Sequence, residues 1–230
     1  MSVWLEKTPG SSSGNTAAMT DVIFKIECRS LPVDHATALA EALCTAQPWL
    51  KQIDNLGIHP VHVAGSQNGW QRPETAEQPL LLSRRTRLRL RVSSTHSAQL
   101  IDSLRNTSLH IDGHKLSVLD GRTSPLQPVA TLFSRYTVYR DNQISPADEN
   151  SFVQQVISEC EGIGFSPNKI LCGRSHTINN HGSDMLVRSV MLAEVPEKYS
   201  LHLQETGLGD LRLLGCGLLI PHKDTSPVNS

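Results

Sequence analysis

Four glycines close to the end of the chain are spaced in a way that could bind phosphate. They lie in the segment ETGLGDLRLLGCGLLIPHK, residues 205–223, and are Gly207, Gly209, Gly215 and Gly217. Glycine allows a phosphate to approach backbone N–H groups closely. A dinucleotide fingerprint would need GxGxxG after the first strand of a parallel unit, whereas these glycines precede the last expected strand. The segment therefore favours a polynucleotide backbone over a nucleotide cofactor, and the competing interpretation is a tight helix-to-strand connection.

Five arginines form a second group that could bind phosphate. The stretch RTRLRLRV alternates strictly, so a strand over residues 85–92 would place its leucines on one face and its arginines on the other. The five residues are Arg84, Arg85, Arg87, Arg89 and Arg91. Neighbouring guanidinium groups repel unless an anion lies across them, and each can donate two hydrogen bonds to a phosphate. Recognition of shape and backbone is expected, because an aromatic content of 4% offers few rings for stacking bases.

A histidine in the first half of the chain could transfer protons. His35 follows Asp34, the expected N-cap of a helix over residues 35–46. A helix N-terminus disfavours the imidazolium form, so this ring should be neutral near pH 7 and able to accept a proton. Taken alone, the position also suits a histidine that makes an ordinary capping contact.

The rest of the composition predicts neither a metal site nor a cofactor. The pairs His59/His62 and His110/His114 lie in strand-turn contexts, where most histidines are structural or solvated. The 5 cysteines are scattered without a CxxC pair, which is typical of a reducing compartment. A net charge of −1 over 230 residues argues against a protein that coats nucleic acid indiscriminately. No apolar run approaches the roughly 20 residues of a membrane helix, and residues 1–18 lack a signal-peptide pattern, so a cytoplasmic protein with no membrane partner is expected.

The elements that must position these residues follow the same order twice. In the first half, strands are expected over residues 21–29, 57–65 and 85–92, with a loop over 66–79. The helix 35–46 separates the first two strands, STHSAQLIDSL predicts a second helix, and SLHIDGHKLSVLD predicts a strand, an Asp-Gly turn and a strand.

After residue 128 the order begins again. VATLFSRYTVYR, NKILCGRSHTI, MLVRSVMLAEV and CGLLIPH predict strands, and the segments that begin at Ser145 and Pro196 predict helices. Each half is thus βαββαβ, the ferredoxin-like unit. We predict an α+β protein of two tandem ferredoxin-like domains, residues 20–125 and 126–223, with a flexible extension at 1–19 and a tail at 224–230.

Together these features resemble the CRISPR-associated endoribonucleases of the RAMP superfamily, in particular their Myxococcus-type subtype. The resemblance is carried by LPVDHATALAEAL (31–43), by RTRLRLRV, and by the repeated element order. Above all it is carried by LQETGLGDLRLLGCGLLIPHK, which follows the pattern GxGxxxxxGxG ahead of the last strand. It covers about residues 20–223 of the chain.

The resemblance implies metal-independent cleavage of precursor CRISPR RNA within its repeats. A ribose 2′-OH would attack the phosphorus and leave a 2′,3′-cyclic phosphate and a 5′-OH end, with His35 as general acid or base. The motif fixes no partner for His35; Arg29 and Ser30 are candidates because they are near it in sequence. Besides the arginine strand, the expected RNA contacts are Lys169, Arg174, Arg212 and the four glycines.

The implied partners are the repeat RNA, the mature crRNA and, if the product is retained, other subunits of the effector complex. Two alternatives stay open at this point. A non-catalytic RAMP-type RNA-binding subunit would need no histidine at position 35. A ferredoxin-like metabolic enzyme should show converging carboxylates or a nucleotide motif, which the sequence lacks.

Overall fold

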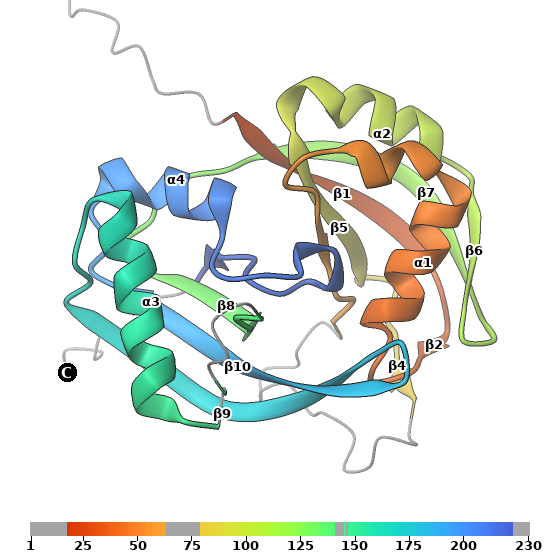
Figure 1. The fold of residues 1–230 in the computed structure, drawn as a ribbon. Coiled ribbons are helices and arrows are strands. Elements are labelled where there is room, and N and C mark those ends of the chain that lie inside the picture. The colour runs from red at the N-terminus through yellow and green to blue at the C-terminus, as the bar shows by residue number, and fades with distance from the viewer. Residues whose placement is uncertain (1–17, 63–78, 141–144, 146, 223–230) are drawn as a thin grey trace, which may run out of the picture.

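The described residues form two main antiparallel sheets, one from each half, and each has two helices packed against it (Figure 1). The computed structural model describes residues 18–62, 79–140, 145 and 147–222. The expected extension before residue 18, nearly all of the loop 66–79 and the tail from 224 lie outside the described residues.

The first half forms a five-stranded sheet in the order β3-β5-β1-β7-β6. Its elements are β1 (Met19–Glu27), α1 (Ala36–Ala46), β3 (Gly57–His59), β5 (Arg87–Ser93), α2 (Ser97–Leu104), β6 (Ser108–Ile111) and β7 (His114–Pro125). A short pair, β2 (Ser30–Leu31) and β4 (Leu80–Leu81), lies outside this sheet. The predicted hairpin between β6 and β7 is confirmed: Asp112 and Gly113 have φ of 45° and 80°, the left-handed values that a tight two-residue turn requires.

The second half repeats this plan in a four-stranded sheet, β11-β8-β10-β9. Its elements are β8 (Leu132–Thr137), α3 (Glu149–Ile163), β9 (Lys169–Asn180), β10 (Ser183–Ala193), α4 (Glu197–Thr206) and β11 (Ile220–Pro221). In both halves the first and third strands of the unit are central and the second and fourth flank them. The prediction of an α+β protein with two tandem ferredoxin-like units is confirmed.

The start of α1 differs from the prediction. Asp34 is not the N-cap, because the carbonyl of His35 accepts the first helical hydrogen bond, from Leu39 at 2.8 Å. The Asp34 carboxylate instead accepts a hydrogen bond from the backbone N–H of Asn179, at the tip of the β9–β10 hairpin. A contact with the other half of the molecule has therefore displaced the local cap.

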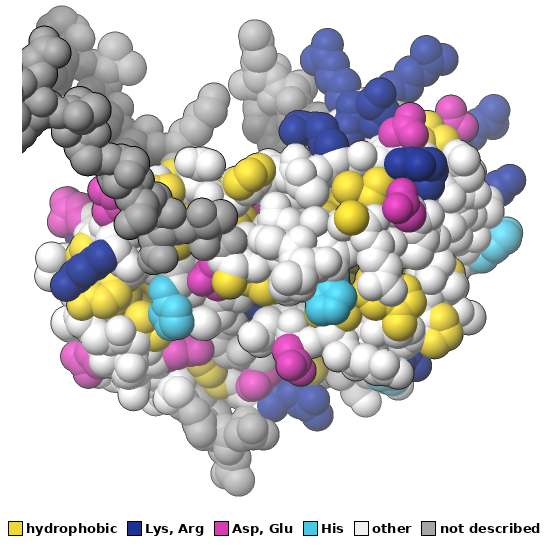
Figure 2. All heavy atoms as spheres, turned by 90° about the horizontal axis from the view of Figure 1, so that it is seen from above, with side chains coloured by type: hydrophobic (Ala, Val, Ile, Leu, Met, Phe, Trp, Pro, Cys, Tyr) yellow, Lys and Arg dark blue, Asp and Glu magenta, His cyan; other side chains and the backbone are white. Residues whose placement is uncertain are grey.

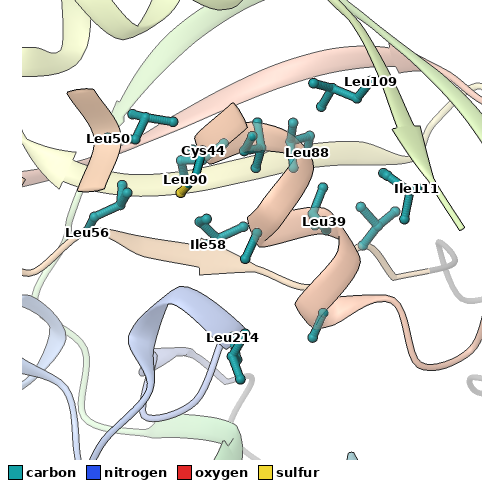
Figure 3. Packing of buried hydrophobic residues seen from close by; sticks show 14 of the residues in the cluster. Leu39, Cys44, Leu50, Leu56, Ile58, Leu88, Leu90, Leu109, Ile111 and Leu214 are labelled. Carbon is teal, nitrogen blue, oxygen red and sulfur yellow. The ribbon is translucent and has the colours of Figure 1, made fainter. Parts of the chain in front are cut away.

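The main core lies between the first sheet and its helices (Figure 3). Leu88 and Leu90 of β5 are fully buried against Leu39 and its neighbours in α1, which confirms the predicted apolar face of the strand. Leu214 belongs to the same cluster although it comes from the segment that follows α4. Figure 3 shows it near Ile58, and its short helical turn contacts both β3 and α1. Burial of each such side chain stabilises the fold by about 1.5–3 kcal/mol.

The two halves are joined by more than the linker between them. The segment after α4 runs between the two sheets in Figure 1, and the β9–β10 hairpin extends to α1. The Thr37 hydroxyl donates to the Asn179 carbonyl at 2.6 Å, and His181 Nδ1 lies 3.1 Å from Glu41 Oε1. The orientation of one half relative to the other is therefore fixed by side chains and not only by chain connectivity.

Candidate functional site

Most of the predicted arginine group lies at one exposed corner of the first sheet. Arg84 and Arg85 are exposed in the turn before β5, and Arg87 is exposed at the start of the strand. The Arg89 side chain is 38% exposed and its Nη1 lies 3.5 Å from Asp21 Oδ2. Figure 2 shows lysine and arginine side chains gathered along one edge of the molecule (dark blue, upper right). Four of the five predicted arginines can thus meet an anion from solvent.

Arg91 is placed differently from the prediction, because its side chain is fully buried. Its Nε donates to Asp21 Oδ1 at 2.8 Å and its Nη2 to Asp21 Oδ2 at 3.2 Å. Its Nη1 donates to the carbonyl oxygens of Gln204 at 2.8 Å and Leu219 at 2.7 Å, both in the second half. The guanidinium therefore bonds the first sheet to the glycine segment and its preceding helix, and it has no surface left for RNA.

The electrostatics of this buried contact keep Asp21 ionised. Burial by itself would raise the pKa of the Asp21 carboxyl, but the Arg91 guanidinium bonded to it holds that pKa well below its usual range. His59 Nε2 is 3.8 Å from Asp21 Oδ1, too far for a hydrogen bond. Burial lowers the pKa of His59 to about 4, so this ring is neutral at pH 7.

The four glycines adopt left-handed conformations, with φ between 64° and 79°. A β carbon added at Gly217 would lie 2.0 Å from the Leu208 carbonyl oxygen, and one added at Gly209 would lie 2.3 Å from that of Val138. At Gly215 the nearest atom would be Pro60 Cδ, at 2.2 Å. Other parts of the protein, not phosphate, fill the space left by the missing side chains. This geometry agrees with the competing interpretation, a tight connection.

The backbone N–H groups of the segment are also committed within the protein. Gly217 donates to the Tyr136 carbonyl at 2.6 Å and Leu208 donates to the Gly217 carbonyl at 3.0 Å. The N–H of Gly209 donates to both carboxyl oxygens of Glu159, each at 3.1 Å. A glutamate side chain therefore occupies the place where a phosphate was expected to sit.

The other predicted RNA contacts divide in the same way. The Arg212 guanidinium donates hydrogen bonds to three backbone carbonyls. Its Nε donates to Asn55 at 3.2 Å, its Nη2 to Glu205 at 3.0 Å, and its Nη1 to Thr206 at 2.5 Å. Lys169 and Arg174 are exposed on β9, the edge strand of the second sheet, and Lys169 forms an ion pair with Glu194. The structure does not bring these two residues onto the sheet that carries the arginine corner.

His35 is enclosed at the start of α1. Its Nδ1 is 2.8 Å from the Pro32 carbonyl oxygen, and its Nε2 accepts a hydrogen bond from the Val61 N–H at 2.9 Å. Burial lowers the pKa of the ring, so it is neutral as predicted, but because of burial and not because of the helix N-terminus. The side chain is 3% exposed, and both nitrogens are in use. In this arrangement the ring holds the approach to α1 against the end of β3, and it borders a small hollow that is also lined by His62 and Tyr136.

An open hollow beside the arginine corner is the feature that sequence reasoning missed. One part is lined by Lys25, Arg29 and Arg84, and a second part, which shares Glu27, Cys28 and Arg29 with the first, continues to the β6–β7 turn. Its lining residues lie up to 94 positions apart, on β1, β2, β7 and the turn before β5. Residues so far apart in sequence are joined only by strand register, so no local pattern could have indicated the hollow. In the described ranges no three His, Cys, Asp or Glu side chains are grouped as a metal site would need.

Comparison with known proteins places this fold. The model of the family described as Cas6 Crispr matches residues 20–224. A protein of Myxococcus xanthus (strain DK1622), the CRISPR-associated endonuclease Cas6, is 27% identical over 217 residues, which are 94% of this chain and 87% of that protein.

Solved structures of similar fold include a CRISPR associated protein Cas6, with a TM-score of 0.59 at 8% identity, over 89% of this chain and 100% of the other. Another, titled as a RAMP protein binding different RNA substrates, has a TM-score of 0.57 at 12% identity, over 87% of this chain and 98% of the other. At these identities the solved structures establish the fold. No helix among the described residues is long and apolar enough to span a membrane.

Proposed function

Because the chain belongs to the Cas6 family of CRISPR-associated endoribonucleases, we propose that it cuts precursor CRISPR RNA within its repeats. Of the alternatives left open by the sequence, the named activity of the Myxococcus xanthus relative favours a nuclease over a non-catalytic RNA-binding subunit. The metabolic enzyme has no support in the family match.

The exposed arginine corner is the observation that carries RNA binding. Arg84, Arg85 and Arg87 have no acidic ion-pair partner among the described residues, although the chain as a whole has a net charge of −1. The hollow next to them adds Lys25 and Arg29. A phosphate backbone laid along this corner would gain charge-assisted hydrogen bonds and release counterions.

The proposed reaction is attack of a ribose 2′-OH on the adjacent phosphorus. The 2′-oxygen loses its proton and forms a bond to phosphorus, the bond from phosphorus to the 5′-oxygen breaks, and that oxygen gains a proton. The products are a 2′,3′-cyclic phosphate and a 5′-OH end. Because the substrate carries its own nucleophile, the protein has to move protons and stabilise charge on the phosphate, which imidazole and guanidinium groups can do without a metal ion.

Incubation with a panel of 5′-labelled CRISPR repeat RNAs tests this proposal. We expect one site-specific cut in at least one repeat, cyclic-phosphate ends, continued cleavage in excess EDTA, and no cleavage when the nucleotide before the cut carries 2′-deoxyribose. Loss of cleavage in EDTA, or cutting of the 2′-deoxy substrate, would refute the reaction. Co-elution of the labelled 5′ product with the protein would support the further proposal that it keeps its crRNA as a subunit of the effector complex.

A further inference from the structure

Cleavage as proposed requires an imidazole or an equivalent group that RNA can reach. His35, which the family resemblance implies, would have to release both the Pro32 carbonyl and the Val61 N–H first. His59 is fully enclosed beside Asp21. A histidine in an open position lies instead on the hairpin between β6 and β7, directly after the Asp-Gly turn: His114, which lines the hollow beside the arginine corner.

His114 is paired with a hydroxyl group. Its Nδ1 lies 3.1 Å from Ser30 Oγ, on the short strand β2 that follows β1. Both side chains are half-buried, so the pair is fixed in place and still borders solvent. Among the described residues, Nε2 of the same ring forms no hydrogen bond. The ring therefore has one nitrogen held by a neighbour and the other available, which is the arrangement that a proton-transfer histidine needs.

The surroundings of the pair are suited to a phosphate. The same hollow is lined by Arg29 and Lys115, both exposed, against a single carboxylate, Glu27. It also continues into the hollow that Arg84 lines, through the residues the two share. An RNA strand bound at the arginine corner can thus follow cationic side chains without a break to His114.

We propose that His114 is a catalytic residue of this endoribonuclease and that Ser30 is the residue that positions it. With the Nδ1 proton donated to Ser30 Oγ, the Nε2 lone pair accepts the proton of the ribose 2′-OH. The 2′-oxygen then bonds to phosphorus, the 5′-oxygen leaves and takes a proton from water, and the resulting hydroxide is neutralised by the imidazolium. Arg29 and Lys115 bind the phosphate oxygens, whose negative charge increases in the transition state. This assignment rests on the proposed function.

The test compares histidine variants on a repeat RNA that the wild-type protein cuts. His114→Ala should slow cleavage by about 10² to 10⁴-fold, the usual contribution of general acid–base catalysis, with RNA affinity changed less than threefold. His110→Ala is the matched control, because His110 is exposed on the same hairpin and lies opposite Lys115. It should cut at the wild-type rate. Added imidazole should restore cleavage to a His114→Gly variant, which a purely structural role for the ring would not allow.

Ser30 is tested by hydroxyl replacement. Ser30→Ala should slow cleavage by about 10-fold or more, and Ser30→Thr should recover most of the loss because it returns the hydroxyl.

The outcomes separate the two proposals. If the wild type cuts no repeat RNA, the proposed function fails and this assignment fails with it. If the wild type cuts and His114→Ala cuts equally fast, only the catalytic assignment of His114 is overturned, and the Ser30–His114 contact is a structural hydrogen bond between the hairpin and β2. If His114→Ala is slow but imidazole does not rescue His114→Gly, the catalytic role is likewise rejected.

Discussion

Replacing Arg91 should unfold the protein more readily and should leave the electrostatics of RNA binding unchanged. Arg91→Met keeps most of the apolar stem and removes the guanidinium. The change leaves the Asp21 carboxylate buried without its cation and deprives the carbonyls of Gln204 and Leu219 of their donor. Removing one partner of a buried ion pair costs about 3–5 kcal/mol of folding free energy.

That magnitude is large against the total stability of a domain, which is about 5–15 kcal/mol. For a chain of this size each kcal/mol lowers Tm by about 2–4 °C. Differential scanning calorimetry should therefore show Arg91→Met melting roughly 6–20 °C below wild type. Arg87→Met is the matched control, because it lies on the same strand with its side chain exposed, and surface changes usually stay within about 0.5 kcal/mol.

A double change separates the ion pair from the rest of the site. Asp21→Asn combined with Arg91→Met removes the uncompensated charge, so the pair should be less destabilised than the sum of the two single variants. The reasoning is refuted if the Arg91→Met and Arg87→Met variants have the same Tm. It is refuted more sharply if Arg91→Met also reduces the slope of log RNA affinity against log salt by about one, because the guanidinium would then face the RNA.

Three further outcomes follow from the same geometry. Gly217→Ala should lower Tm by several degrees, because the added β carbon would lie 2.0 Å from the Leu208 carbonyl oxygen. Gly162→Ala, whose added β carbon would have no neighbouring atom within 4 Å, should leave Tm unchanged or raise it. Equal changes in Tm for the two variants would contradict the packing argument. Arg85→Ala combined with Arg87→Ala should flatten the salt dependence of RNA affinity by roughly one to two units in a binding titration, and an unchanged slope would place the RNA on another surface. The pKa of His59 is lower in the folded state (about 4) than in the unfolded state (6.5). The free energy of unfolding, measured by urea titration, should therefore fall by about 3 kcal/mol as pH drops through that interval. His59→Gln should remove this loss of stability, and an unchanged pH dependence in that variant would assign the loss to another group.

Local patterns were sufficient to predict the order of the main elements, but β3 ends at His59 within the expected strand 57–65 and β11 covers only Ile220–Pro221. Alternation of leucine and arginine located β5 and its buried face, and Asp112-Gly113 located the hairpin turn because only residues that tolerate positive φ fit there. The repeated element order was sufficient for the ferredoxin-like topology of both sheets. These features depend on neighbours within a few residues, which the sequence displays directly.

The state of the candidate site residues could not be predicted in the same way. Alternation places Arg91 on the polar face of β5 correctly. Whether that face is exposed to solvent depends on Gln204 and Leu219, which lie 113 and 128 residues away in the sequence. His35 is closed off by Val61, 26 residues on. The contact between Ser30 and His114 spans 84 residues, and neither side chain carries a motif. Burial and pairing of polar groups follow from the docking of distant segments, which composition and periodicity do not encode.

The residues that make the family resemblance visible in the sequence are therefore mostly those that close the fold. His35 ties α1 to the end of β3, the glycines let the last segment pass between the two sheets, and Arg91 bonds that segment from the opposite side. Most of these groups are buried among other parts of the protein, which leaves little of their surface for an RNA. We therefore propose that RNA recognition and chemistry use the exposed corner of the first sheet and the hollow beside it, where Arg84, Arg85 and Arg87 have no acidic partner among the described residues and the His114 imidazole is half-buried. It follows that stability and RNA binding should separate cleanly by mutation: changes at enclosed motif residues should move Tm, and changes at the corner should move the salt slope.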